Sequence, residues 1–401
     1  MLWENLTVED LQVPGFLAAA GPAGLKKGGG KDLGIIFSTV PATVAGVFTR
    51  NRVKAAPVFF DIERIDSEKC QAIAANSGNA NACTGIQGMR DAEAMALATG
   101  NALQIDESLV MVASTGVIGK TLDISKIENA IPGIVQYLTP SGLSEVAEAI
   151  MTTDRVPKIV SKKGTISGKE FTVTAMAKGA GMIRPDMATM LCFICTDIGA
   201  SHTILQESLT IAVDKSFNII TVDGDTSTND TVLLLANGLS GIFLEDDMAL
   251  GMFQDILDDL LGQLARMIVK DGEGATKLVT VLVKGGRTVD EAKGVAETVA
   301  NSSLVKTAIF GEDANWGRIM AAVGRAGVVI NPDAIDIYFD DICMVKSGIG
   351  MGDEAETAAT KVLKSDQFTI TIDLNSGEEK AELLTCDLSI DYVKINADYR
   401  T

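Results

Sequence analysis

Hydrophobic residues in the first half of the chain form short runs that polar turns interrupt. Short apolar or alternating runs are typical of strands, and longer stretches rich in Ala, Met and Glu are typical of helices. On this basis we predict strands at residues 33–37, 43–48, 72–75 and 109–113 and within 165–177, and helices at 90–103, 124–138 and 144–151.

After a glycine-rich loop, residues 190–195 are apolar without a break. Such continuity is typical of a strand whose two faces are both buried. The pattern beyond it predicts helices at residues 207–216, 230–236 and 246–269, and strands at 277–283, 335–339, 368–373 and 380–385. This mixture predicts an α+β fold in which a layered β core is flanked by helices.

The composition is that of an ordinary globular protein. The 401 residues are 47% hydrophobic and 22% charged, which is enough for two domains or for one domain built from two long segments. A formal net charge of −19 would repel nucleic-acid backbones and anionic membrane surfaces, so we expect neither as a partner. Six cysteines without a secretory segment indicate reduced thiols, and we expect a cytoplasmic protein.

The segment from Lys178 to Leu191 has the most informative pattern, because a glycine-rich polar loop leads into the apolar run through Thr189. A threonine hydroxyl needs a base beside it to act as a nucleophile. A cut between Ala188 and Thr189 would supply that base, since a free α-amino group has an ordinary pKa of about 7.7 to 8.0. Thr189 is therefore the candidate nucleophile.

A series of further motifs follows a fixed order along the chain. They occupy residues 76–85, 114–116, 152–154, 178–191, 221–230, 271–274, 311–318 and the tail from 396 to 401. Together they resemble the ornithine acetyltransferases, also called bifunctional arginine-biosynthesis glutamate N-acetyltransferases, from end to end. Ala180, Asp186 and Ala314 stand where the family pattern has Ser, Asn and Pro. None of these three departures removes a nucleophile or an oxyanion donor.

The resemblance implies that the chain cuts itself between Ala188 and Thr189 into an α chain, residues 1–188, and a β chain, residues 189–401. The two chains would share one αββα-like sandwich and pair again into a heterotetramer of two α and two β chains. Thr189 would take the acetyl group of N2-acetyl-L-ornithine as an acetyl-threonine ester and pass it to L-glutamate, within arginine biosynthesis. No cofactor is implied, and the resemblance leaves open whether acetyl-CoA also donates acetyl groups.

The same resemblance implies roles for residues outside the loop. Thr115 and Gly116 would form the oxyanion hole, which stabilises the charge that develops on the attacked carbonyl oxygen. Lys178 would bind the substrate carboxylate, and Glu273 would pair with the ornithine ammonium group. Further substrate contacts would come from Thr152, Thr153, Asn396 and Thr401. The sequence does not decide whether Thr152 or Thr153 points inward.

Two other functions fit the same residues. In a threonine-nucleophile aminopeptidase or amidase, water would resolve the acyl-enzyme, and acetate would appear without any amine acceptor. An amino-acid-binding protein would never cut itself, and the chain would stay intact.

Two motifs that suggest other chemistry are interpreted as structural. Ser114 occupies the position of the first glycine of a phosphate-binding loop, so residues 114–121 do not match that motif. Cys192 and Cys195 lie in a predicted buried strand without a second pair of ligands, so we expect no metal site there.

The remaining polar clusters are also given structural roles. A possible cation loop in the motif at 221–230 does not match a calcium-binding pattern. We interpret its acidic residues, Asp223, Asp225 and Asp230, as part of the cap of a following helix. His202 is interpreted as a satisfied surface or capping histidine.

Overall fold

The computed structural model describes residues 7–184 and 190–397, and these fold into two compact units. The first unit contains residues 7–182, 190–218 and 225–268, and the second contains 183–184, 219–224 and 269–397. Each unit has its own β-sheet. The described parts of the chain contain no helix that is long and apolar enough to cross a lipid bilayer.

The first unit is built on an eight-stranded sheet in the order β4-β3-β2-β8-β7-β6-β5, with β1 paired to β2. Its strands are β1 (Phe16–Gly21), β2 (Leu33–Phe48), β3 (Lys69–Asn76), β4 (Val110–Ser114), β5 (Lys158–Ile166), β6 (Lys169–Lys178), β7 (Leu191–Thr196) and β8 (Thr231–Ala236). Its helices are α1 (Ala56–Arg64), α2 (Gly85–Leu103), α3 (Ile124–Val135), α4 (Leu143–Ala149), α5 (His202–Asp214) and most of α6 (Asp247–Lys270).

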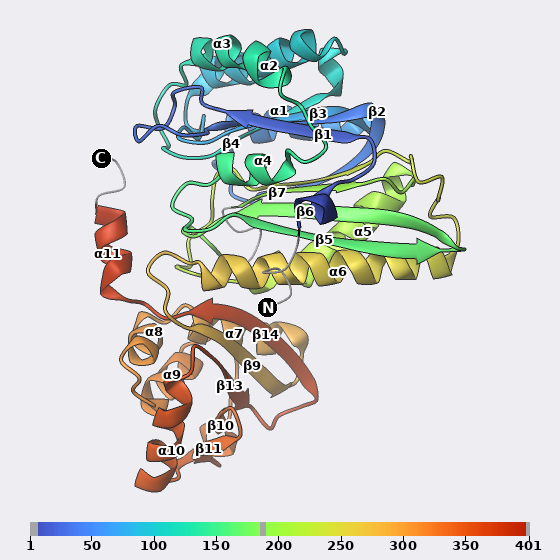
Figure 1. Ribbon diagram of the computed structural model, residues 1–401. Helices are drawn as coiled ribbons and strands as arrows, with labels where there is room; N and C mark the ends of the chain where they lie inside the picture. Colours follow the sequence, from blue (N-terminus) through green and yellow to red (C-terminus); the bar gives the residue numbers. More distant parts are fainter. Residues whose placement is uncertain (1–6, 185–189, 398–401) are drawn as a thin grey trace. The chain divides into compact units, whose positions relative to one another are not determined.

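Strand β2 allows this single sheet to form two layers. Residues 33–37 of β2 pair with β3, and residues 43–48 pair with β8. The register against β3 shifts between Phe37 and Ala42, a stretch that includes Pro41, which has no N–H to donate to a ladder. Figure 1 shows the result, with β1–β4 in one layer and β5–β7 in the other.

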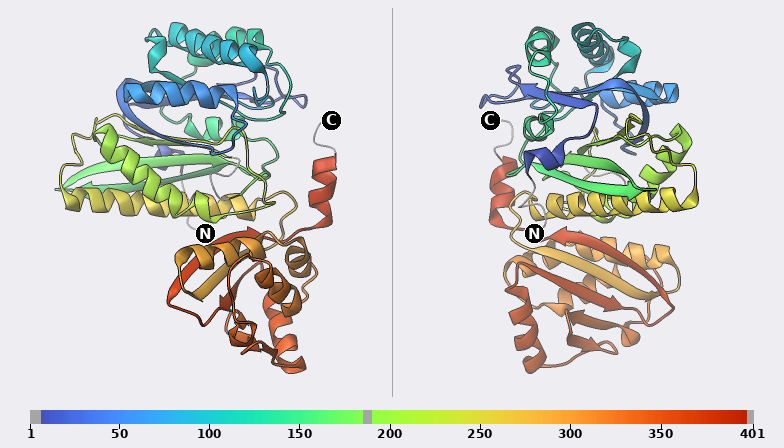
Figure 2. Two further views of the ribbon diagram at one scale, coloured as in Figure 1. Left: turned by 180° about the vertical axis from the view of Figure 1, so that it is seen from behind. Right: turned by 45° about the vertical axis from the view of Figure 1, so that its right-hand side comes forward.

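Helices cover the outer faces of both layers. Helices α1, α2 and α3 pack on the layer of β1–β4, whereas α4 lies between the two layers, against β1, β2, β5 and β6 (Figure 1). Helices α5 and α6 lie along the other layer (Figure 2). The ring of Phe253 in α6 contacts the ring of Phe171 in β6. Alternate residues of β3 serve both cores, since Ile73 packs between the layers and Ala72 packs under the helices. The predicted αββα-like arrangement of an α+β fold is confirmed for this unit.

Strands β7 and β8 pair with each other, but the sequence predicted a strand for the first and a helix for the second. The prediction for residues 190–195 is confirmed, because every residue of β7 is buried. The helix predicted at residues 230–236 is wrong, because this segment is strand β8, which is buried throughout and pairs with β2 and β7. A short, continuously apolar run satisfies either structure locally, and here the ladder partners on both sides decide for the strand.

The second unit has a six-stranded sheet in the order β12-β11-β10-β13-β9-β14. Its strands are β9 (Leu278–Gly286), β10 (Asp336–Phe339), β11 (Ile342–Lys346), β12 (Ile349–Gly350), β13 (Gln367–Asp373) and β14 (Glu379–Cys386). Its helices are α7 (Val289–Ala300), α8 (Ser303–Phe310), α9 (Trp316–Gly324), α10 (Asp353–Leu363) and α11 (Ile390–Ala397).

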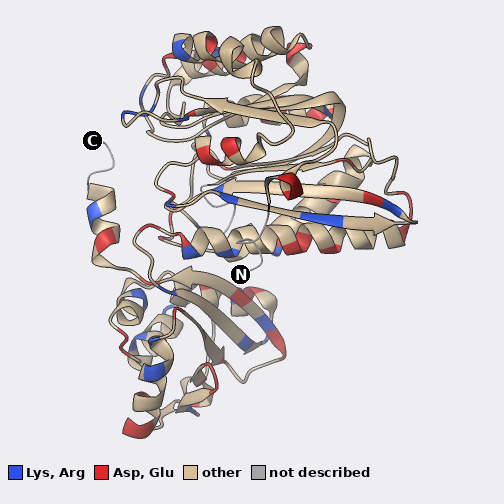
Figure 3. Cartoon of the chain, in the orientation of Figure 1, with Lys and Arg blue, Asp and Glu red and all other residues tan. Residues whose placement is uncertain are grey.

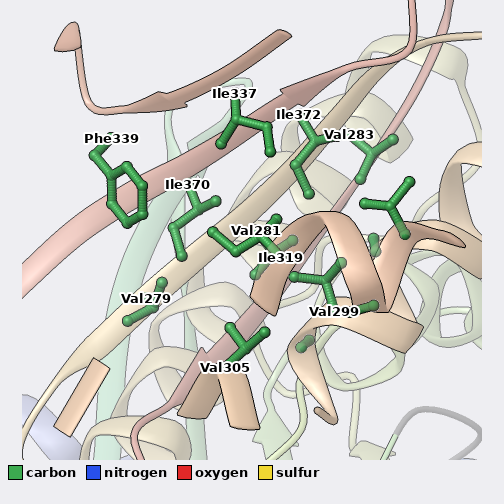
Figure 4. Close-up of a cluster of buried hydrophobic side chains, with 14 of the residues drawn as sticks. Val279, Val281, Val283, Val299, Val305, Ile319, Ile337, Phe339, Ile370 and Ile372 are labelled. Atoms are coloured by element: carbon green, nitrogen blue, oxygen red, sulfur yellow. The ribbon is translucent and has the colours of Figure 1, made fainter. Parts of the chain in front are cut away.

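One hydrophobic core holds the second unit together. Alternate residues of β9, namely Val279, Val281 and Val283, lie on the same face of the sheet as Ile370 and Ile372 of the parallel neighbour β13 (Figure 4). Valines and alanines of α7 complete it from the helical side. The period of two in β9 is the pattern expected of a strand with one face on a core.

The compact units do not coincide with the two predicted chains. Strands β7 and β8 follow residue 189 in the sequence, yet they lie in the first unit between β2 and β6. A cut after residue 188 would therefore leave the first unit composed of both products. Charged side chains lie mainly on the helices, the loops and the exposed strand ends, and the inner strands carry few of them (Figure 3).

Candidate active site

The polar turn after β4 is held in an unusual backbone conformation. Gly116 has φ of +132°, and a Cβ atom there would lie 2.4 Å from the carbonyl carbon of Gly78 and 2.6 Å from the nitrogen of Asn79. Any side chain would collide with backbone that has no flexible end to move aside. Glycine at position 116 is thus required by the close approach of the loop that follows β3.

Asparagines from two other motifs lock this turn in place. The backbone N–H of Thr115 donates to the carbonyl oxygen of Asn76 at 3.0 Å, and the Ser114 hydroxyl donates to Asn76 Oδ1 at 2.6 Å. Asn229 Nδ2 donates to the carbonyl oxygen of Ser114 at 2.8 Å. Because the Thr115 N–H is used in this scaffold, the group that Thr115 can offer to a ligand is its hydroxyl.

Lys178 reaches this turn from the other layer of the first unit. It is the last residue of β6, its exposed fraction is 3%, and its Nζ donates to the Thr115 hydroxyl oxygen at 3.3 Å. A hydroxyl that accepts a hydrogen bond keeps its own proton to donate elsewhere. The structure therefore brings together three of the predicted site residues, Thr115, Gly116 and Lys178.

Asp154 is a residue of this site whose role sequence reasoning missed. Its buried carboxylate accepts hydrogen bonds from Lys158 Nζ at 2.7 Å, from the Gly179 N–H at 2.7 Å and from the Thr152 N–H at 3.0 Å. Burial alone would raise the pKa of this carboxyl, but the ammonium groups of Lys178 and Lys158 lower it to about 2. Asp154 therefore stays ionised and joins the predicted threonine pair to the end of β6.

The predicted pair Thr152 and Thr153 lies in the turn that Asp154 closes. Both residues are half-buried, and the Thr152 backbone is fixed through its N–H. The tripeptide 152–154 occurs among the motifs of the sequence, so the available signal for Asp154 was its place beside two candidate threonines.

A second buried carboxyl lies where the glycine-rich loop meets β7. Asp230, which has an exposed fraction of 0%, accepts a hydrogen bond from the Met190 N–H at 3.1 Å. Ala188, Thr189 and Asp186 lie outside the described residues. The predicted helix cap is wrong for Asp230, because the strand β8 follows it and its carboxyl group holds the head of β7.

The second unit brings together two of the predicted substrate contacts. Asn396 in α11 donates from Nδ2 to Glu273 Oε2 at 2.7 Å, and Glu273 has an exposed fraction of 7%. Gly274, with φ of +69°, permits this, because a Cβ atom there would lie 2.5 Å from the nitrogen of Tyr392 at the start of α11. Thr401 lies outside the described residues.

The described parts of the chain show neither a clustered set of metal ligands nor an exposed thiol at Cys192 or Cys195. These parts contain no group of three or more His, Cys, Asp or Glu side chains able to hold a metal ion. Burial raises the pKa of the Cys192 and Cys195 thiols, which makes them poor nucleophiles and ligands. His202 begins α5, and its Nδ1 lies 2.7 Å from the carbonyl oxygen of Val44, as expected of a satisfied histidine.

The motifs that build these sites are those of a known family. A family model described as the ArgJ family matches residues 17–401. The chain belongs to the ArgJ family. This confirms the resemblance on which the roles of Thr115, Lys178 and Glu273 were predicted.

The sequences of two individual relatives agree with this assignment. The arginine biosynthesis bifunctional protein ArgJ of Geobacter sulfurreducens is 50% identical to this chain over 98% of the chain and 100% of its own length. The glutamate N-acetyltransferase of Methanocaldococcus jannaschii is 46% identical over 95% of the chain and 98% of its own length. A crystal structure of arginine biosynthesis bifunctional protein ArgJ from Bacillus halodurans is 41% identical, with a TM-score of 0.49, and covers 51% of this chain and 97% of that one.

Residues of the ArgJ motifs also stabilise the fold, in addition to any chemical role. The motif at residues 76–85 supports the turn at Thr115, and the motif at 221–230 contributes Asn229 and Asp230 to the same unit. Ala180 and Ala314, which depart from the predicted pattern, are both buried. Small apolar side chains at these two positions leave no unsatisfied polar atom.

Proposed function

We propose that this ArgJ-family protein is an enzyme of arginine biosynthesis that transfers the acetyl group of N2-acetyl-L-ornithine to L-glutamate. The names of its relatives, arginine biosynthesis bifunctional protein and glutamate N-acetyltransferase, support this activity. The proposal includes cleavage between Ala188 and Thr189, after which the new α-amino group serves as base for the Thr189 hydroxyl.

The contact between Lys178 and Thr115 is the observation that carries the proposal. In acyl transfer, negative charge develops on the attacked carbonyl oxygen, and two fixed hydrogen-bond donors in a dry site stabilise it. We assign those donors to the Thr115 hydroxyl, which accepts from Lys178 Nζ at 3.3 Å, and to the backbone N–H of Gly116. The Thr115 oxygen already accepts a hydrogen bond from Lys178, so the Thr115 proton is left to donate to another group. This arrangement suits an oxyanion, which accepts that proton in a hydrogen bond.

The substrate charges match the remaining assignments. Lys178 is the group that we assign to the substrate carboxylate, and the buried Glu273 carboxylate, oriented by Asn396, is assigned to the ornithine ammonium. Thr152, Thr153 and Thr401 complete the proposed substrate contacts. No cofactor enters these steps, and acetyl-CoA is a possible second acetyl donor that only an assay decides. A heterotetramer of two α and two β chains in the cytoplasm is part of the same proposal.

Intact-mass spectrometry combined with donor-specific assays tests this function. The purified chain should give two fragments that meet between residues 188 and 189, and it should form N-acetylglutamate from acetylornithine and glutamate. Thr189→Ala should abolish both cleavage and transfer. Thr99→Ala is the matched control, because Thr99 is a buried threonine of α2 whose hydroxyl only caps the Met95 carbonyl within its helix.

Three outcomes would contradict parts of this proposal. Cleavage or transfer by Thr189→Ala would remove the nucleophile assignment. Release of acetate at the same rate with and without glutamate would favour the amidase alternative, in which water resolves the ester. An intact chain that binds amino acids without turnover would favour the binding protein. Glutamate acetylation from acetyl-CoA, measured separately, decides whether the enzyme is bifunctional.

A further inference from the structure

Lys26 is a half-buried lysine in the loop between β1 and β2, and it is not among the residues assigned to the proposed transfer. Its Nζ donates to the carbonyl oxygen of Lys31 at 2.9 Å, within the loop, and to that of Ala149 at 3.2 Å, at the end of α4. The buried Asp32 carboxylate accepts the backbone N–H of Lys26 at 2.9 Å, which fixes the loop itself. An ammonium group has three N–H donors, and in the described parts of the chain the third has no partner.

The loop that carries Lys26 packs against the polar turn of the candidate site. A Cβ atom on Gly78 would lie 3.1 Å from the carbonyl carbon of Leu25 and 3.2 Å from the nitrogen of Lys26. A Cβ atom on Gly116 would lie 2.4 Å from the carbonyl carbon of Gly78. Three backbone segments are therefore stacked directly on one another, and they bring the backbone of Lys26 close to the turn that carries the proposed oxyanion donors.

Charges of the candidate site act on the Lys26 ammonium group. Burial lowers its pKa, the carboxylates of Asp32 and Asp154 raise it, and the Lys178 ammonium lowers it further. Charges affect one another in this way only when they lie close together. Lys158 is fully buried and bound directly to Asp154, so it serves that carboxylate and not a ligand. Lys26 and Lys178 are thus the two ammonium groups that this part of the site offers to a ligand.

The two substrates of the proposed reaction bring different charges to the enzyme. N2-acetyl-L-ornithine has one carboxylate, and its side chain ends in the ammonium group that we assign to Glu273. L-Glutamate has two carboxylates, and its side chain ends in the second of them. The Glu273 carboxylate repels that second carboxylate, and Lys178 is assigned to the α-carboxylate of either substrate. Binding of glutamate therefore needs a further cation that the acetyl donor does not use.

We propose that Lys26 binds the side-chain carboxylate of L-glutamate and so selects the acceptor of the acetyl group. A charge-assisted hydrogen bond from the remaining N–H of Lys26 stabilises bound glutamate, and neither ornithine nor acetylornithine has a carboxylate that makes it. Lys26 is thus a binding residue that determines specificity, and it takes no part in bond formation. This inference rests on the proposed transfer between acetylornithine and glutamate.

The two halves of a transfer through an acyl-enzyme can be measured separately. Exchange of labelled ornithine into N2-acetylornithine needs only the donor half-reaction, and exchange of labelled glutamate into N-acetylglutamate needs only the acceptor half-reaction. Lys26→Met keeps the aliphatic stem and removes the charge. It should lower kcat/KM of the glutamate exchange by about 10- to 100-fold, mainly through KM, and leave the ornithine exchange within about twofold. Equal losses in the two exchanges would overturn the inference.

A neutral acceptor makes the comparison sharper. L-Glutamine has the shape of glutamate, with an amide in place of the side-chain carboxylate. The ratio of kcat/KM for glutamate to that for glutamine should fall by about tenfold or more in Lys26→Met. Lys31→Met is the matched control, because Lys31 lies in the same loop and its ammonium group is held by Glu145 and Glu148. The control should keep the ratio within about twofold, whereas an unchanged ratio in Lys26→Met would overturn the inference.

Lys26→Gln covers the case in which Lys26→Met does not fold, as judged by its circular dichroism spectrum. The glutamine amide can still donate to the carbonyl oxygens of Lys31 and Ala149 but carries no charge, so this variant should also lose the preference for glutamate. Parallel loss of both exchanges in both variants would assign Lys26 a structural role and overturn the inference. An unsubstituted chain that catalyses neither exchange contradicts the proposed transfer itself, whereas a preference for glutamate that survives in the uncharged variants contradicts only this inference.

Discussion

Two buried aspartates in the first unit occupy similar positions and have opposite electrostatics. Asp154 and Asp230 each accept a backbone N–H beside a segment of the candidate site, at Gly179 and at Met190. Asp154 also binds the Lys158 ammonium directly, and its pKa is lowered to about 2. Asp230 has no directly bound cation among the described residues, and burial raises its pKa.

The difference lies in the partners and not in the residue type. Lys178 acts on both carboxyl groups, yet only at Asp154 does a second ammonium add enough charge to overcome burial. The same amino acid is therefore held as an anion at the end of β6, whereas at the head of β7 burial raises the pKa of its carboxyl. A sequence motif that contains aspartate does not specify which of these two states it will have.

Removing the fixed anion should have the largest effect on stability. Asp154→Ala leaves the fully buried Lys158 ammonium without its carboxylate, and breaking one partner of a buried pair typically costs about 3 to 5 kcal/mol of unfolding free energy. Urea unfolding followed by circular dichroism measures this loss. Asp259→Ala is the control, since its pair with Lys162 is exposed and contributes at most about 1 kcal/mol. Equal losses of unfolding free energy in the two variants would show that water screens the pair of Asp154 and Lys158 as it screens the exposed pair.

Much of the fold could be predicted from local patterns. The alternating valines of β9 identify a strand, because a period of two matches a strand with one buried face, and the unbroken apolar run of β7 is consistent with a strand buried on both faces. Strand β8 was predicted as a helix, because Val232–Leu235 is equally compatible with both until its ladders with β2 and β7 are known. Only pairing between distant segments settles such a case.

The site was predictable where the family resemblance names residues, and less so where contacts are long-range. Thr115 and Lys178 were both predicted, and the structure joins them directly. The role of Asp154 depends on the β5–β6 hairpin, which returns the chain from Lys158 to Gly179. The role of Asp230 depends on the parallel pairing of β7 with β8. Neither contact has a signature in the local sequence.

The opposite pKa shifts of the two aspartates should be separable by acid. The pKa of Asp154 is lowered from 3.8 to about 2, so its ionised form stabilises the folded chain above pH 3.8, and this contribution disappears as the pH falls towards 2. The contribution is about 2 kcal/mol at neutral pH. The difference in unfolding free energy between the unsubstituted chain and Asp154→Asn should therefore shrink by that amount between pH 5 and pH 2. A difference that is constant over this range would contradict the ionised cluster.

The effect of Asp230→Asn on stability should depend on pH in the opposite direction. Below pH 3.8 the carboxyl is protonated in both states, whereas above it only the unfolded chain ionises, so the raised pKa makes Asp230 increasingly destabilising. Asparagine removes that penalty but buries a polar group of its own, at a cost of about 1 kcal/mol. The two terms oppose each other, so the gain in stability should be smaller than the penalty that is removed.

The comparison is made in a Thr189→Ala background, so that the substituted and reference chains are both uncut. The variant should gain stability relative to the reference as the pH rises from 4 to 7, as measured by thermal unfolding at each pH. A loss that grows with pH would mean that Asp230 is ionised in the folded chain, as Asp154 is.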